Sequence, residues 1–563
     1  MLLVSLLLSW VTAITLTPFF ASLLFKDNVQ THNGQASNTA QQNEVELYQG
    51  VIFTLYRKLL SAALRYRVAT YSITLLLLVC AVMGFAKVKQ VFFPPSNTPI
   101  FLVDLWQPEG TDIRQSAEDA VQLMKYLLAQ DGVSHVTSTS GRGAERFMLT
   151  YQPEKNFSAY SQLIVRADSL EQLPGIMQLT RSYISDQLPR LQYKLLRLEV
   201  GPSTPAKIEA RFSGADPDVL RNLAAQAKAI LQADGQAVSI RDNWRERTKV
   251  IRPHFNEAMA RRVGISKQDI DDVLLTAMSG RTVGIYRDGT HLLPIVARSP
   301  LAERDNLDAL YDLQVYSNKL QRYVPITQVV TGFDLVWEDA QIQRRDRKRT
   351  VTVMADHDNL SDDTAAALLA RVKADIEAIA LPTGYFLTWG GEFEAQQKAQ
   401  HALFSSLPLG YLFMFIITVL LFNSLRGALV IWACVPLAII GVSFGLLLLG
   451  APFGFIALLG FLSLSGMLVK NCIVLLEQIN LERSEGKAAF NAVFDSAVSR
   501  VRPVSMAAIT TILGMIPLLG DVFFASLAVV IMFGLGFATL LTLVFMPVLY
   551  CSVFNIKTII TKD

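Results

Sequence analysis

One lysine lies where the surrounding sequence makes a charge costly. Lys470 interrupts a largely apolar segment at residues 453–479, nine residues before its end, so about 13 Å of helix would separate it from water at ~1.5 Å per residue. A lysine at that depth costs roughly 2.5–3.5 kcal/mol, and such residues usually face a bundle interior with an acidic partner. Exchange of charge between a lysine and a carboxylate is the chemistry of a proton or ion relay.

Other polar residues lie close to this lysine. Ser463, Lys470 and Glu477 share a seven-residue spacing and therefore one helix face, Asn471 is adjacent, and Gly466 permits close approach of another helix. A lysine that extends to the membrane surface without a role is the alternative, and Glu477 is close enough to the segment end to reach water. No other apolar segment carries a carboxylate at comparable depth, so a relay partner must lie elsewhere.

The elements that must position these residues are membrane-spanning helices. Of the 563 residues, 51% are hydrophobic and 18% charged, and the apolar residues are clustered. Each charge-free stretch is at least about as long as a spanning helix, and the longest is divided by turn residues at 450–454, which predicts seven helices. These stretches are residues 1–25, 68–86, 402–425, 427–469, 503–520 and 522–556.

Basic residues in the short connections predict the orientation. Lysines and arginines fall on one side, whereas the two short opposite loops, around Pro452 and Asp521, carry none, so the basic side is cytoplasmic. Residues 1–25 could instead be a signal peptide, but they lack a positive start and exceed the usual apolar length. The basic residues are Lys26, Arg57, Lys58, Arg65, Arg67, Arg426, Arg483, Lys487, Arg500, Arg502, Lys557 and Lys562.

The segment between the second and third predicted spans has a repeated pattern. Residues 100–200 alternate strand, helix, strand, strand, helix, strand, a ferredoxin-like βαββαβ order. A second set begins at residue 207, but about 100 residues separate its second strand from its third, so residues 249–344 are predicted to be an inserted subdomain. On the cytoplasmic side, residues 27–43 are polar and predicted to be disordered, and residues 45–67 have the spacing of an interfacial helix.

Several function classes have no support in the sequence. The net charge of +3 is spread over 51 basic and 48 acidic residues without a long basic tract, which argues against nucleic acid as a partner. Six histidines show no metal-ligand spacing, and neither a P-loop nor a Gly-x-Ser-x-Gly motif occurs. The four cysteines lie in predicted spans and suggest packing rather than redox chemistry. We therefore expect neither an enzyme, nor a metal site, nor a cofactor.

Several motifs together resemble a known transporter family. They are GMLVKNCIV at 466–474, EGKA at 485–488, RVRP at 500–503, TILGMIPL at 511–518, LTP at 16–18, FPP at 93–95, PEGT at 108–111, VGIS at 263–266, GRTVG at 280–284 and VPI at 324–326. Over nearly the whole chain, the sequence resembles resistance-nodulation-division (RND) efflux permeases of the acriflavine-resistance type. Such permeases have twelve spans in two repeated halves, and this sequence corresponds to helices six to twelve.

The resemblance implies an α+β membrane protein with a seven-helix bundle, two periplasmic porter subdomains and a docking subdomain. It also implies the bacterial inner membrane, a homotrimer driven by the proton gradient, a periplasmic adaptor, an outer-membrane channel, and a missing N-terminal half. The ranges are a transmembrane helix at 1–25, a cytoplasmic linker and interfacial helix at 26–67, a transmembrane helix at 68–91, a porter subdomain at 92–203, a second at 204–248 and 345–401, the docking subdomain at 249–344 and five helices at 402–556.

The resemblance also assigns residues. Lys470 matches the relay lysine, with Asn471 beside it, and Arg500 matches an arginine at the start of the next helix; Ser463, Thr510 and Thr511 are supporting candidates. The acidic pair of the family lies on a helix that this chain does not contain. Ala507 stands where a threonine is common. The aromatic-rich strand of the drug pocket is hard to find, so the sequence identifies no substrate-binding residues.

Three functions follow as hypotheses. The first is a component of a proton-driven pump that exports small amphiphilic or toxic compounds across the cell envelope. The second is a truncated, non-transporting remnant, or a half-transporter that requires a separate N-terminal half. The third is a protein-export helper or lipid transporter of the wider superfamily, against which the long insertion argues because the outer domains there should be smaller.

Overall fold

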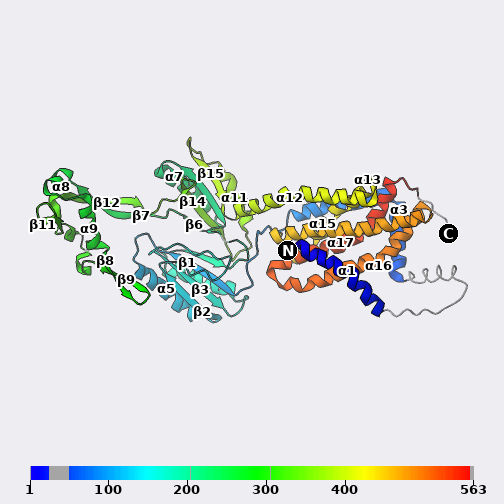
Figure 1. Ribbon diagram of the computed structural model, residues 1–563, viewed down its shortest axis with the longest axis horizontal. Helices are drawn as coiled ribbons and strands as arrows, with labels where there is room; N and C mark the ends of the chain where they lie inside the picture. The colour runs from blue at the N-terminus through cyan, green and yellow to red at the C-terminus, as the bar shows by residue number, and fades with distance from the viewer. Residues whose placement is uncertain (1, 25–49, 203, 305, 558–563) are drawn as a thin grey trace.

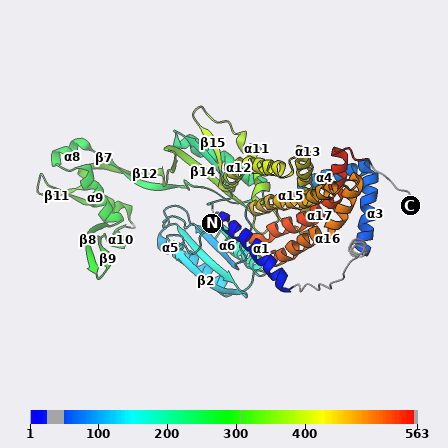
Figure 2. The same cartoon turned by 45° about the vertical axis from the view of Figure 1, so that its right-hand side comes forward.

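The molecule is elongated, with an apolar helix bundle at one end and two β-sheet units beside it. The computed structural model describes residues 2–24, 50–202, 204–304 and 306–557 (Figure 1). The sheet units lie in the middle, and the inserted residues extend beyond them to the far end (Figures 1 and 2). Residues 27–43, predicted to be disordered, lie outside the described residues.

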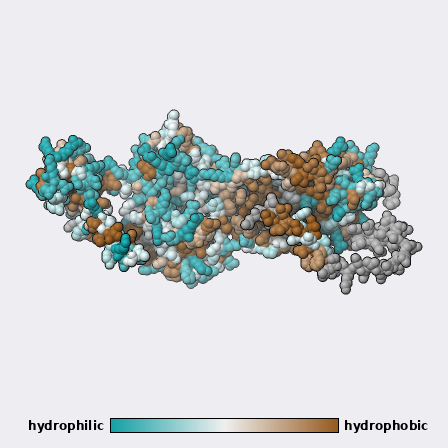
Figure 3. Space-filling model, viewed as in Figure 1, coloured by the Kyte–Doolittle hydropathy of each residue, from teal (hydrophilic) through white to brown (hydrophobic). Residues whose placement is uncertain are grey.

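Six helices in the described residues are long and apolar enough to cross a membrane. Figure 3 shows the apolar surface concentrated on this bundle. An apolar stretch at Leu7–Phe20, within α1 (Leu2–Leu24), is shorter, so the seventh span stays a prediction. The six are α4 (Arg67–Phe85), α12 (Gly391–Phe422), Leu425–Leu449 (α13, η3 and α14), α15 (Phe455–Ser484), Ala489–Gly520 (α16 and η4) and α17 (Val522–Val553).

Close packing of α14 (Ala438–Leu449) on α17 holds the middle of the bundle together. A Cβ atom on Gly441 would lie 2.3 Å from the carbonyl oxygen of Phe533, and one on Gly445 would lie 2.5 Å from the Phe533 side chain. Only glycine allows this approach, because any side chain would push the helices apart. The bundle core therefore depends on van der Waals contact between backbones.

The strands and helices of the first sheet unit lie between residues 100 and 197, and the unit extends to Glu199, which pairs with Pro95 in an isolated bridge. Its strands are in the order β2-β3-β1-β4, all antiparallel, which is the order of a ferredoxin-like βαββαβ unit. Inward-facing residues of β1 and β3, such as Val103 and Leu163, pack against Leu123 and Ile176 of the helices. The elements are β1 (Ile100–Trp106), α5 (Ile113–Leu128), β2 (Val133–Ser140), β3 (Tyr160–Ala167), α6 (Leu173–Gln187) and β4 (Gln192–Arg197).

The second sheet unit has the same strand order, β6-β14-β5-β15, although its sequence is interrupted between β6 and β14 as predicted. A two-residue strand, β13 (Arg344–Arg345), pairs with the start of β14. Phe212, Val353 and Leu223 lie in the hydrophobic core of the second sheet unit. The elements are β5 (Ile208–Gly214), α7 (Pro217–Asp234), β6 (Ala237–Asp242), β14 (Lys348–His357), α11 (Ala365–Glu377) and β15 (Phe386–Gly390).

The inserted unit is carried on two long paired strands, β7 (Arg247–Phe255) and β12 (Val330–Asp339), which lead away from the sheets (Figure 1). Its small core contains Ile270, Val315 and Ile326. The remaining elements are α8 (Glu257–Val263), α9 (Lys267–Met278), β8 (Arg281–Asp288), β9 (His291–Ala297), α10 (Leu301–Arg304), η1 (Leu307–Leu310), β10 (Gln314–Ser317), β11 (Arg322–Pro325) and η2 (Ile326–Gln328).

The predicted boundary at residue 402 falls inside a helix. Helix α12 begins at Gly391, directly after β15, and continues for 32 residues into the bundle. Gly391 has a φ of 68°, and a Cβ there would lie 2.5 Å from the carbonyl oxygen of Lys207. The predicted boundary marks the start of the apolar run, whereas the charged turns that precede it are also helical.

Candidate functional site

Lys470 lies at the centre of α15. Fourteen residues, or about 21 Å of helix at ~1.5 Å per residue, separate it from the end of the helix at Ser484. The helix thus continues beyond the apolar segment at residues 453–479 into polar residues. The Lys470 side chain is exposed and forms no ion pair with any of the described residues.

The predicted polar face of α15 is uncovered along its length. Ser463 and Glu477 are exposed like Lys470, and Asn471 is half-buried. The opposite face is buried against other helices of the bundle, with Leu468 and Cys472 in its core. The structure therefore places Ser463, Lys470 and Glu477 together on an open face, available to groups outside the described residues.

Arg500 contacts α15 at a different level from Lys470. It lies on α16 (Ala489–Met515), and its Nη2 donates a hydrogen bond to Oε1 of Gln478, about two turns nearer the C-terminal end of α15. Its Nε is buried without a hydrogen-bond partner. Thr510 and Thr511 both donate their hydroxyl protons to the carbonyl oxygen of Ala507, at 3.0 and 2.9 Å. The relay roles of these residues stay predictions.

The structure adds two polar residues that sequence analysis missed. Thr539 and Thr542 of α17 are buried, and neither hydroxyl has a hydrogen-bond partner. Helix α17 packs against α15 and α16, so these hydroxyls lie within the bundle. Their three-residue spacing on an apolar helix was the available signal, but threonine is common in packed spans and does not stand out without burial information.

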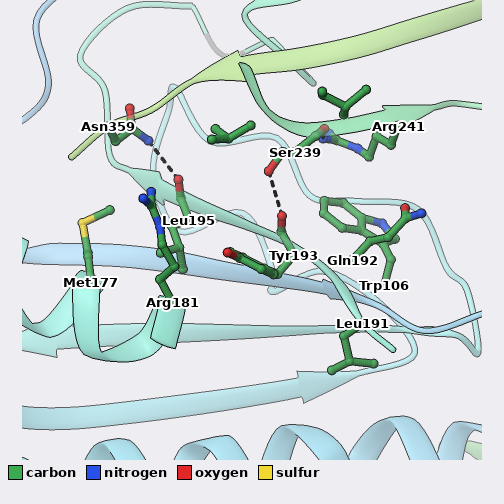
Figure 4. Close-up of a pocket in the computed structure, with 12 residues that line it drawn as sticks. Trp106, Met177, Arg181, Leu191, Gln192, Tyr193, Leu195, Ser239, Arg241 and Asn359 are labelled. Carbon is green, nitrogen blue, oxygen red and sulfur yellow. Dashed lines mark hydrogen bonds between the residues drawn. The ribbon is translucent and has the colours of Figure 1, made fainter. Parts of the chain in front are cut away.

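A cavity of about 330 Å³ lies where the two sheet units meet. Strand β4 of the first unit and β6 of the second form its walls (Figure 4). The Ser239 hydroxyl donates to the carbonyl oxygen of Tyr193 at 2.7 Å, and Asn359 Nδ2 donates to that of Leu195 at 2.9 Å. The Arg241 guanidinium lies 4.4 Å from the centre of the Trp106 ring.

A larger cleft of about 530 Å³ shares the Trp106 and Arg241 wall. Tyr160 Oη and Gln162 Nε2 donate to one oxygen of Asp104, at 2.8 and 2.7 Å. Basic residues outnumber acidic ones on its walls. The charged lining residues are Lys155, Lys194, Arg211, Arg241, Arg245 and Arg345, with Asp104, Glu154, Glu209 and Asp242.

Buried ion pairs join the sheet units to α12. Lys207, at the start of the second unit, contacts Glu199 of the first unit at 2.5 Å and Glu392 of α12 at 2.9 Å. Burial alone would lower the pKa of Lys207, but the two carboxylates raise it above its ordinary value. Arg211 similarly joins Glu209 to Glu394 of α12. The start of this spanning helix is thus held by charges from both units.

A second buried group links the sheets to each other. Lys194 of β4 contacts Asp356 of β14 at 3.1 Å. Burial would raise the pKa of Asp356, but Lys194 and Arg241 hold it below its ordinary value. The neighbouring His357 has a buried Nδ1 without a partner, and burial, followed by the charge of Lys207, lowers its pKa.

The described residues contain no group of three or more histidine, cysteine, aspartate or glutamate side chains that could hold a metal ion. The cysteines among them are all free. The arrangement offers instead an open, lysine-bearing helix face in the bundle and an aromatic, cation-rich cleft between the sheets.

Apolar helices carrying two βαββαβ units, the second with an insertion, define a transporter of the RND type. The chain belongs to the AcrB/AcrD/AcrF family, whose model matches residues 1–554. This confirms the predicted family. Members of this class are efflux transporters rather than enzymes.

Curated relatives are named for metal resistance. The cobalt-zinc-cadmium resistance protein CzcA of Cupriavidus metallidurans is 26% identical over 521 residues, covering 88% of this chain and 48% of that protein. The nickel and cobalt resistance protein CnrA of the same organism is 29% identical, covering 85% and 46%. The nickel-cobalt-cadmium resistance protein NccA of Alcaligenes xylosoxydans xylosoxydans is 27% identical, covering 97% and 51%. The chain thus spans about half the length of these relatives.

A solved structure shows the same fold. The crystal structure of a heavy metal efflux pump in crystal form II matches with a TM-score of 0.75 and 22% identity, covering 91% of this chain and 52% of that chain. Crystal form I matches equally well, with a TM-score of 0.75 and 23% identity. The arrangement of bundle, sheet units and insertion is therefore that of an RND efflux pump.

Proposed function

We propose that this chain is part of a proton-driven RND efflux pump in a bacterial inner membrane. Family membership supports the transport function, and the lone lysine at the centre of α15 supports the proposed coupling of transport to proton movement. In this proposal the sheet units are periplasmic porter subdomains and the inserted unit is the docking subdomain. The pump is a homotrimer that works with a periplasmic adaptor and an outer-membrane channel.

Lys470 acts by exchanging ion-pair partners. A carboxylate pair from a complementary half of the transporter approaches the open face of α15, and Lys470 pairs with it when it is ionised. Protonation of the carboxylates breaks that pair and leaves the lysine to find other acceptors. Asn471 and Ser463 lie on or beside this face, whereas Arg500, Thr510 and Thr511 lie on α16, which packs against α15.

The cargo proposed is a small amphiphile that carries a negative group. The stacked Trp106 and Arg241 form a wall common to both cavities, which combines an apolar surface with a cation. The predominance of basic residues in the larger cleft favours an anion over a cation there.

Divalent metal cations are the second candidate, because the relatives above are named for cobalt, zinc, cadmium and nickel resistance. In the cleft, four carboxylates and one thioether could supply oxygen and sulfur ligands: Asp104, Glu154, Glu209, Asp242 and Met354. They do not form a three-ligand group in the described residues. This candidate therefore requires ligands contributed from outside them.

One experiment separates these candidates. The chain is co-expressed with a complementary half in a strain without RND pumps, and survival is measured in an anionic bile salt and in zinc, cobalt or nickel salts. The first proposal expects protection against the bile salt that is lost in Arg241→Gln; protection against metals alone supports the second. Wild-type survival no better than that of cells without the chain, in all conditions, supports a non-transporting remnant.

A further inference from the structure

The short helix α3 (Val51–Arg65) lies across the end of the bundle. Figures 1 and 2 both show it crosswise to the long helices, at the end remote from the sheets. One face is packed into the bundle: Tyr56, Leu60 and Leu64 are buried, and the Tyr56 hydroxyl donates to the carbonyl oxygen of Leu543 in α17 at 2.8 Å. The helix is therefore a fixed part of the protein.

A second face of α3 is apolar but uncovered. Val51, Leu55, Leu59 and Tyr66, four to seven residues apart, form this apolar stripe. The side chain of Leu55 is 69% exposed and that of Leu59 is 55% exposed. The stripe runs beside the buried face on a helix at the end of a membrane bundle, so we assign it to the acyl-chain boundary of the bilayer.

A third face is basic. Arg57, Lys58 and Arg65 are exposed, form no ion pair within the described residues, and share the helix with no acidic residue. Arg57 has a nearby carboxylate in Asp495 of α16, whereas Lys58 and Arg65 are seven residues apart and point to the same side. Arg65 also lies 5.5 Å from the centre of the Tyr66 ring.

Arg67 makes hydrogen bonds within the protein and is not part of the basic face. Arg67 Nη2 donates to the carbonyl oxygen of Ile556 at 2.6 Å, and its Nε donates to that of Leu64 at 3.3 Å. It therefore attaches Ile556 to the junction of α3 and α4. The cations of Lys58 and Arg65 border the apolar stripe, and neither forms an ion pair among the described residues.

We propose that α3 binds anionic phospholipid headgroups of the cytoplasmic leaflet, with Lys58 and Arg65 as the main contacts and the apolar stripe against the acyl chains. The separation of a protein-packed, an apolar and a basic face on one helix fits a lipid that offers both a chain and a negative headgroup. The assignment to the cytoplasmic leaflet rests on the proposed function and its orientation in the membrane, whereas lipid binding by α3 does not depend on which cargo is exported.

The test titrates the full-length chain in mild detergent with phosphatidylglycerol and phosphatidylcholine, and counts bound lipids by native mass spectrometry. We expect the wild type to prefer phosphatidylglycerol, with a loss of about fivefold for each of Lys58→Gln and Arg65→Gln, and a weaker preference at high salt. Lys267→Gln, which removes an exposed cation of the inserted unit, is the matched control.

Two further outcomes decide the proposal. Leu55→Ser with Leu59→Ser is expected to weaken both lipids together, because it changes the acyl-chain contact and not the headgroup contact. Equal binding of the two lipids by the wild type, or an unchanged preference in the Lys58→Gln, Arg65→Gln double variant with an unaltered melting temperature, would overturn the proposal. An acidic protein captured through Lys58 without lipid preference would overturn it as well.

Discussion

The membrane bundle and the paired sheet units differ in how their lysines are paired. In the sheet units, Lys194 and Lys207 are almost fully buried and each is paired with carboxylates at 2.5–3.1 Å. In the bundle, Lys470 lies at the middle of a spanning helix with no carboxylate partner among the described residues. The comparison indicates that the paired lysines of the sheet units stabilise the fold, whereas the unpaired lysine of the bundle is free to pair with a group outside the described residues.

The largest effect is expected at the unpaired charge. Lys470→Met should reduce proton-driven efflux to background, because the relay loses its cation, while folding is not weakened since the charge itself costs roughly 2.5–3.5 kcal/mol at the helix centre. Efflux of the cargo from proteoliposomes or from cells with the complementary half measures this. Leu420→Ala, at a 74% exposed position on α12, is the control. Continued efflux by Lys470→Met would remove the lysine from the mechanism.

The next effect is expected at a paired charge. Lys207→Met should lower the free energy of unfolding of the sheet units by about 3–5 kcal/mol, because it leaves Glu199 and Glu392 buried without a cation. Urea unfolding followed by tryptophan fluorescence measures the loss. Adding Glu199→Gln and Glu392→Gln should restore much of it. A single variant as stable as the wild type would show that this network is not a structural joint.

A smaller, pH-dependent effect is expected from His357. Because its pKa is lowered in the folded protein, the unfolded chain binds its proton first as the pH falls below about 6.5, and stability is lost from there down to the folded pKa. The slope for one proton is at most about 1.4 kcal/mol per pH unit. His357→Gln should flatten unfolding stability between about pH 7 and 5. His135→Gln, at an exposed position, is the control. If His357→Gln leaves the slope of stability against pH as unchanged as this control does, the lowered pKa of His357 does not account for the pH dependence.

The smallest effect is expected at an exposed ion pair between a lysine and a carboxylate. Lys89 Nζ lies 2.8 Å from Asp362, whose side chain is 98% exposed. Water screens such a pair, so Lys89→Gln should leave the melting temperature within experimental error. A loss comparable with that of Lys207→Met would mean that burial does not explain the difference between the two pairs.

Much of the fold could be predicted from periodicity. Strand alternation placed β1, β2 and β5 within about two residues, and the long gap after β6 located the insertion, because burial of one sheet face imposes a period of two on the sequence. The apolar run that predicted the third span begins at residue 402, eleven residues after the start of α12, because the first turns carry Glu392 and Glu394, which pair with the second sheet unit.

The candidate site was only partly predictable. Lys470 and its face could be found because charge in an apolar helix is costly wherever it lies. The contact of Arg500 with Gln478, the unpaired hydroxyls of Thr539 and Thr542, and the stacking of Arg241 on Trp106 join residues far apart in the chain. No local pattern encodes such pairs.

The sequence alone indicated the class of protein through its motifs, and six apolar helices and the two sheet units through hydrophobic patterning, which acts along the chain. Only the tertiary structure decided which charges are satisfied. Pairing depends on distance in space, which the order of residues along the chain does not give. The tertiary structure showed that Lys207 joins α12 to both sheet units and that Lys470 faces outward from the described bundle. It also showed that Lys58 and Arg65 border an uncovered apolar stripe.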